Sequence, residues 1–156
     1  MISNISTLPR RLSGVLLALS AGFAGAQQAA AEEMTVYKSP TCGCCKVWVD
    51  HVKAAGFDVT VHETRDVSPV KQQAGLAPQL ASCHTAFVNG YLIEGHVPAA
   101  DIQRLLQEKP DALGLSVPGM PAGENVPGME VPGVKAKFDV LLVSKDGGAV
   151  PYSHYE

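Results

Sequence analysis

The chain has 156 residues, which is enough for one globular domain and leaves little room for two. It is 46% hydrophobic and only 17% charged, which argues against disorder, because disordered chains combine low hydrophobicity with high net charge. A net charge of -3 offers no basic surface to a phosphate backbone, so nucleic-acid binding is not expected.

The first 31 residues have the pattern of a secretory signal peptide. Arg10 and Arg11 precede an uncharged apolar stretch over 12–23, and small residues suited to cleavage after Ala26 or Ala31 follow it. This stretch is shorter than the roughly 20 residues that a membrane-spanning helix needs, so no stable membrane insertion is expected. The sequence therefore predicts export to the periplasm, where thiols are kept reduced by partners or held by a metal.

The first expected elements surround a cluster of cysteines. Residues 34–38 favour a strand, which a Ser-Pro-Thr segment over 39–41 interrupts. A helix is expected over 44–55, because its apolar residues recur at helical spacing and a glycine follows. The cysteine cluster thus lies where this helix begins.

A strand and a short helix are expected next. Apolar and polar residues alternate over 58–63, as on a strand. Ser68 is expected to cap a helix that has Pro69 at its first position and ends at Gly75.

A hairpin and a third helix complete the predicted core. Strands over 85–88 and 91–94 flank an Asn-Gly pair, and a helix follows over 98–108. The order β-α-β-α-β-β-α is that of a thioredoxin or glutaredoxin core, with helices over both faces of a sheet. The sequence predicts an α/β fold whose thioredoxin-like core spans 32–110.

Residues 111–156 are expected to add a Pro/Gly/Met-rich loop and a C-terminal β-hairpin to the same domain. The hairpin strands, 138–144 and 149–152, would either extend the sheet or cover the loop. Two Val-Pro-Gly-Met segments present Met120 and Met129 in similar turns. Each methionine is either a soft ligand for Cu(I) or a hydrophobic anchor for the loop.

Three cysteines within four residues indicate chemistry. Cys42 and Cys45 form a C-x-x-C motif with Cys44 inside it, at a helix N-terminus that stabilises thiolates. The thiolate is both the nucleophile and the metal ligand. Cys83 lies just before the strand expected over 85–88, and in thioredoxin-like folds that loop lies against the C-x-x-C. All four thiols are therefore expected to converge.

The five histidines differ in context. His96 ends the hairpin and precedes a helix, so it is a candidate ligand or a neighbour of the ligands. His84, beside Cys83, could point toward the thiols or away from them. His51 is interpreted as a packing or hydrogen-bonding residue, and His62 and His154 as solvated.

At these motifs the sequence resembles a bacterial family long catalogued as a domain of unknown function, whose best-known members are the CopG-type periplasmic copper-resistance proteins. The resemblance covers essentially all of the chain after the signal peptide, including the Val-Pro-Gly-Met repeats. It is carried above all by Tyr37 to Lys46, Ser82-Cys83-His84-Thr85-Ala86 and Glu94-Gly95-His96-Val97-Pro98-Ala99. It implies a thioredoxin-like domain whose four cysteines, which match those of the family, hold several Cu(I) ions in a thiolate-bridged cluster.

The function expected on these grounds is an exported copper-binding protein of copper resistance or homeostasis, served by periplasmic copper-handling partners. Conversion between Cu(I) and Cu(II), and hence enzyme activity, stays open. A periplasmic thiol-disulfide oxidoreductase using Cys42 and Cys45 is the alternative, and it leaves Cys44 and Cys83 without a role. Zinc is a third interpretation, although adjacent cysteines strain a single tetrahedral site. The predicted metal ligands are Cys42, Cys44, Cys45, Cys83, His96, Met120 and Met129.

Overall fold

The computed structural model describes residue 1 and residues 31–156. The predicted signal peptide lies outside the described residues except at its two ends. Within the described part of the chain, no helix is both long and apolar enough to cross a membrane.

Strands and helices alternate along the chain in the predicted order as far as the third helix. The elements are β1 (Glu33–Lys38), α1 (Gly43–Ala54), β2 (Asp58–Glu63), α2 (Ser68–Gln73), the 3-10 turn η1 (Pro78–Leu80), β3 (Thr85–Val88), β4 (Tyr91–Glu94), α3 (Ala99–Glu108), β5 (Gly114–Ser116), β6 (Phe138–Val143) and β7 (Ala149–Tyr155). The strands form one mixed seven-stranded sheet in the order β2-β1-β3-β4-β5-β6-β7. The α/β class is therefore confirmed.

One hydrophobic core lies between the sheet and helices α1 and α3. Val36 and Ile93 from the sheet meet Trp48 from α1, and Ile102 and Leu105 from α3, with all five side chains fully buried. Burial of such side chains contributes roughly 1.5–3 kcal/mol each relative to exposure. This core fixes α1, and with it the cysteine motif, against the sheet.

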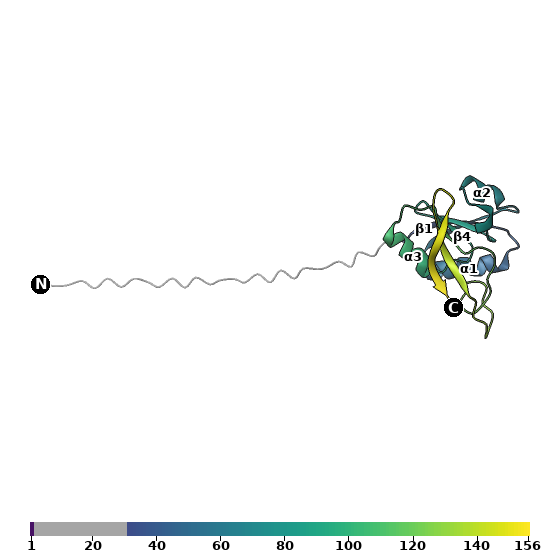
Figure 1. Ribbon diagram of the computed structural model, residues 1–156. Helices are drawn as coiled ribbons and strands as arrows, with labels where there is room; N and C mark the ends of the chain where they lie inside the picture. The colour runs from purple at the N-terminus through teal and green to yellow at the C-terminus, as the bar shows by residue number, and fades with distance from the viewer. Residues whose placement is uncertain (2–30) are drawn as a thin grey trace.

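A second, smaller core covers the opposite face of the sheet. It contains Leu76, Leu80, Leu92 and Val143. Leu92 and Ile93 are neighbours on β4, so their side chains point to opposite faces and into different cores. Figure 1 shows α2 on the other side of the sheet from α1 and α3.

The short strand β5 was not expected, because its three residues lie in the Pro/Gly-rich stretch. It pairs in parallel with β4 and antiparallel with β6. A Cβ atom at Gly114 would lie 1.7 Å from the Leu92 carbonyl oxygen, so the close approach of β5 to β4 requires glycine. Through β5, the C-terminal hairpin of β6 and β7 extends the sheet rather than only covering the loop.

The predicted cap of α2 was wrong by one residue. Val67 is the N-cap and its side chain makes no capping bond, whereas Ser68 is the first helical residue. The Ser68 backbone N–H donates instead to Asp66 Oδ1 at 2.9 Å. An aspartate two residues upstream thus satisfies one of the orphan N–H donors of the first helical turn.

Candidate metal centre

The cysteine motif is held at the first turn of α1. Cys42 is the N-cap residue, and its Sγ accepts the backbone N–H of Cys45 at 3.3 Å. Free N–H groups and the helix dipole favour negative charge at this position. Cys45 is buried, while Cys42 and Cys44 are half-buried. The first turn therefore presents sulfur both to the interior and to the surface.

Two of the cysteines are joined and two are free. Cys42 and Cys45 form a disulfide, with their Cα atoms 5.4 Å apart. Cys44 and Cys83 are free thiols, and Cys44 Sγ lies 3.4 Å from Cys42 Sγ. In this oxidised state, only Cys44 and Cys83 offer thiol sulfur to a metal.

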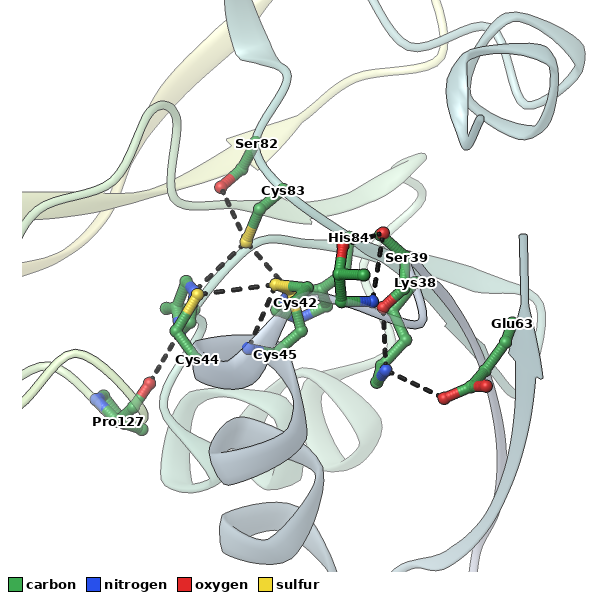
Figure 2. Close-up of a disulfide and its surroundings, with 12 residues drawn as sticks. Lys38, Ser39, Cys42, Cys44, Cys45, Glu63, Ser82, Cys83, His84 and Pro127 are labelled. Carbon is green, nitrogen blue, oxygen red and sulfur yellow. Dashed lines mark hydrogen bonds and ion pairs between the residues drawn. A yellow bond between two sulfur atoms is a disulfide. The ribbon is translucent and has the colours of Figure 1, made fainter. Parts of the chain in front are cut away.

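Cys83 reaches the motif from the loop before β3. Figure 2 shows it next to Ser82, pointing toward the cysteines at the start of α1. The ligand atoms of all four cysteines lie within 4.8 Å of one another. The structure thus brings Cys83 to the three cysteines of the motif, which lie about forty residues away in the sequence.

His96 faces Cys83 with a defined tautomer. Its Nδ1 lies 2.7 Å from the carbonyl oxygen of Pro127, which can only accept a hydrogen bond, so Nδ1 carries the proton. Its Nε2 lies 3.1 Å from Cys83 Sγ and accepts there. A backbone carbonyl that holds one imidazole nitrogen in this way leaves the other free to bind a metal.

His84 also points toward the thiols. Its Nδ1 lies 3.3 Å from Cys83 Sγ, and its ring packs 4.3 Å from that of Trp48. Its buried Nε2 has no hydrogen-bond partner among the described residues. Cys83, His84 and His96 form a second group of ligand atoms within 4.8 Å. Sequence reasoning left the direction of His84 open, since adjacency to Cys83 does not set it.

Burial controls protonation at this site. Desolvation raises the pKa of the Cys83 thiol to about 11. It lowers the pKa of His96, and it holds that of His84 well below the ordinary value, with His96 adding to the effect. At neutral pH the site therefore holds one thiol proton on Cys83 and two neutral imidazoles, and a metal bound to Cys83 would displace that proton.

The other three histidines belong to neither group of ligand atoms. His51 Nε2 accepts the Ala99 backbone N–H at 3.1 Å, which confirms its expected hydrogen-bonding role and ties α1 to the start of α3. His62 and His154 are exposed, as expected. His154 Nδ1 pairs with Asp139, and this contact raises its pKa.

The two Val-Pro-Gly-Met turns have different surroundings. Met129 packs against the main core, as a hydrophobic anchor would, whereas Met120 is 55% exposed. A Cβ atom at Gly128 would lie 2.6 Å from the Cys44 carbonyl oxygen, so the second turn presses on the first turn of α1. Metal binding by either methionine stays a prediction.

The donor set fits a soft metal ion. Thiolate sulfur and imidazole nitrogen suit Cu(I) and zinc, whereas magnesium and calcium prefer oxygen. His84 Nδ1, which lies 3.3 Å from Cys83 Sγ, adds a further nitrogen to these donors. Cys42 and Cys45 join the set once their disulfide is reduced.

The fold and the site together define a class of protein. It is a mixed α/β domain with a cluster of cysteines and histidines at a helix N-terminus. Residues 80–129 match a family described as protein of unknown function, DUF411. A solved structure of copper resistance protein CopG, form 2, is 40% identical, with a TM-score of 0.76, over 81% of this chain and 99% of that one. Form 1 is 41% identical, with a TM-score of 0.74, over 79% and 96%.

At this identity and coverage, the chain belongs to the DUF411 family of CopG-type proteins, as the resemblance implied. No curated protein matches the chain significantly.

Proposed function

We propose that this chain is an exported, periplasmic copper-binding protein of copper resistance that holds Cu(I) between the cysteine motif and Cys83. The observation that carries the proposal is that Cys83 belongs to two groups of ligand atoms, one made of four sulfurs and one that adds His84 and His96. Copper is favoured because both solved relatives are copper resistance proteins and because these donors are soft.

Several copper ions fit this site better than one zinc ion. Structural zinc takes four ligands in a tetrahedron. Here three other sulfurs and two imidazoles cluster around the shared Cys83, and Cys44 and Cys45 are adjacent in the chain. Bridging thiolates can serve two ions each, so this arrangement supports a multinuclear Cu(I) site, with Met120 as a candidate outer ligand.

The disulfide also supports a redox role. When reduced Cys42 and Cys45 form their disulfide, they release two electrons and two protons. Two Cu(II) ions that accept one electron each become Cu(I), which the remaining thiols and His96 can hold. The reaction balances without a further reactant, and it supports interconversion of Cu(I) and Cu(II) at this site.

The fold supports the same proposal. The element order through α3, with the cysteine motif between β1 and α1, supports a thioredoxin-like core over 32–110. Residues 111–156 belong to the same domain in this proposal, since their strands continue the sheet. We propose that residues 1–31 direct export and that periplasmic copper-handling proteins exchange copper with the site.

A thiol-disulfide oxidoreductase is the second candidate, favoured by the Cys42–Cys45 disulfide. Cys42 is half-buried, so an external thiol can approach it, whereas Cys45 is buried. A surface groove of about 350 Å³ opens beside Cys42 and could receive a peptide. This candidate leaves Cys44, Cys83 and His96 without a role.

A Cu(I) titration of the reduced protein tests the proposal. With a competing chromophoric Cu(I) chelator and no oxygen, we expect more than one Cu(I) per chain. Cys44→Ser and Cys83→Ser should each lower that number, and His96→Gln should weaken binding. His62→Gln is the matched control, because His62 is exposed and belongs to neither group of ligand atoms. Unchanged stoichiometry in both cysteine variants would refute the shared site.

A further inference from the structure

A buried ion pair lies behind the Cys83 loop, and the proposed copper site does not use it. Lys71 Nζ of α2 and Glu94 Oε1 of β4 are 2.5 Å apart, and their side chains are 11% and 0% exposed. Charged side chains are rarely so buried unless they are paired. The pair therefore needs an explanation.

The carboxylate of Glu94 joins four segments of the fold. Its Oε1 accepts from Lys71 Nζ and, at 2.6 Å, from the backbone N–H of Ser82. Its Oε2 accepts from the Thr85 hydroxyl at 2.7 Å, and Lys71 Nζ also donates to Thr85 Oγ1 at 2.8 Å. We call Lys71, Thr85 and Glu94 the buried clamp.

Stability alone does not account for the buried clamp. Desolvation of two charges offsets most of their attraction, and well-packed apolar residues often serve as well in such positions. What the clamp does fix is the backbone on either side of the donors. Ser82 directly precedes Cys83, and Glu94 lies two residues before His96.

Further bonds hold the backbone around Cys83, one to the segment that carries His96 and one to Gly119. The Gly95 backbone N–H donates to the His84 carbonyl oxygen at 3.1 Å. The Ser82 hydroxyl donates to the Gly119 carbonyl oxygen at 2.5 Å. The backbone that carries Cys83 is thus tied to the segment that carries His96, and their ligand atoms end 3.1 Å apart.

We propose that the buried clamp positions Cys83 and His96 as a preformed donor pair, with Glu94 acting through the backbone N–H of Ser82. The role of the donor pair rests on the proposed copper-binding function, whereas the positions of Cys83 and His96 do not depend on a bound metal. Lys71 neutralises the carboxylate and Thr85 orients it. All three are positioning residues, and residues that orient metal ligands commonly affect affinity about 10- to 100-fold.

Two double variants separate charge from position. Lys71→Met with Glu94→Gln removes both charges and keeps an oxygen acceptor for the Ser82 N–H. Lys71→Met with Glu94→Leu removes the charges and the acceptor. Lys46→Met with Asp50→Asn is the matched control, since it removes an exposed ion pair of α1 near the same cysteines.

The first measurement needs no copper. Reduced apo protein is treated with iodoacetamide at a temperature where each variant is folded, and alkylation of Cys83 is followed by peptide mass spectrometry. We expect faster alkylation of Cys83 only in the Leu double variant, because the Cys83 loop then loses the acceptor that holds the Ser82 N–H. The Gln double variant and the control should react at the wild-type rate.

The second measurement is Cu(I) affinity by chelator competition, with the copper-nitrogen contribution followed by X-ray absorption. The Leu double variant should lose affinity about 10- to 100-fold and lose the nitrogen ligand, while the Gln variant keeps both. Wild-type behaviour of the Leu variant, or equal changes in both double variants, would overturn the proposal.

A second pair of variants, both at Ser82, keeps the test decisive if the Leu double variant does not fold. Ser82→Pro removes the backbone N–H, and Ser82→Ala keeps it while removing the same hydroxyl. We expect faster Cys83 alkylation in Ser82→Pro than in Ser82→Ala, and equal rates would overturn the proposal. If the wild-type protein fails to bind Cu(I), the proposed function fails, while alkylation still tests the buried clamp.

Discussion

At Cys83, the surroundings set the reactivity of a single thiol. The side chain is half-buried, and its sulfur lies within hydrogen-bonding distance of two neutral imidazoles. Burial disfavours the thiolate, while a metal cation favours it. A thiol in this state is slow to react with oxidants or alkylating agents, and it becomes a ligand only when a metal displaces its proton.

The pH dependence of Cys83 alkylation follows from its pKa of about 11 against an ordinary value of 9.0. Only the thiolate reacts, so in the folded apo protein the rate should keep rising up to about pH 11. In the denatured chain, the alkylation rate should stop rising near pH 9.0, the ordinary pKa of a cysteine thiol. The measurement is a pH–rate profile for the Cys83 peptide. A folded-state midpoint near 9.0 would contradict the burial argument.

At the scale of elements, the second Val-Pro-Gly-Met turn packs against α1. Pro127 accepts the His96 hydrogen bond, and Gly128 lies against Cys44 and the Trp48 backbone. The first turn has no such contact at its glycine: around a Cβ at Gly119 the space is open. The two repeats are alike in sequence, yet only the second contacts the helix through its glycine.

Alanine at these two glycines should therefore have unequal effects. Both have positive φ, +69° at Gly119 and +81° at Gly128, so each substitution carries a backbone cost of about 1–2 kcal/mol. Gly128→Ala adds steric conflict with Cys44 and Trp48, for about 1–3 kcal/mol more. Chemical denaturation of the reduced, copper-free protein measures both. Equal losses of unfolding free energy would show that the second turn does not press on α1.

At the scale of the whole molecule, copper binding and disulfide exchange predict different phenotypes. Exchange needs an attacking and a resolving thiol, Cys42 and Cys45, whereas the proposed copper site also needs Cys83. The wild-type protein should reduce or isomerise protein disulfides poorly. In cells that depend on this protein for copper tolerance, Cys83→Ser at wild-type expression should lose that tolerance.

The opposite result would support the oxidoreductase. It would consist of normal copper tolerance in the Cys83→Ser strain, with misoxidised exported proteins in a Cys42→Ser strain. Immunoblots of the variants establish equal expression, and growth on graded copper concentrations gives the readout.

Local patterns were sufficient for the elements that carry the cysteines. Helical spacing and the Asn-Gly turn predicted α1, β3 and β4, and element order placed Cys83 near the motif. β5 was missed because its three residues are defined by pairing with β4 and β6, not by their own propensity. The orientation of His84 and the bond between His96 and Pro127 depend on packing between distant segments, which no local pattern encodes.

The hydrogen bond from His96 to Pro127 also has a consequence for biosynthesis. A ribosome completes the chain from its N-terminus, so the cysteine motif is synthesised long before the segment that sets the tautomer of His96. A nascent chain ending before Pro127 carries all four cysteines but lacks the acceptor for that imidazole and the turn that rests on α1. Maturation of the site is thus a late event, and a prematurely terminated chain would carry its four thiols without the anchored His96 and without the turn that packs on α1.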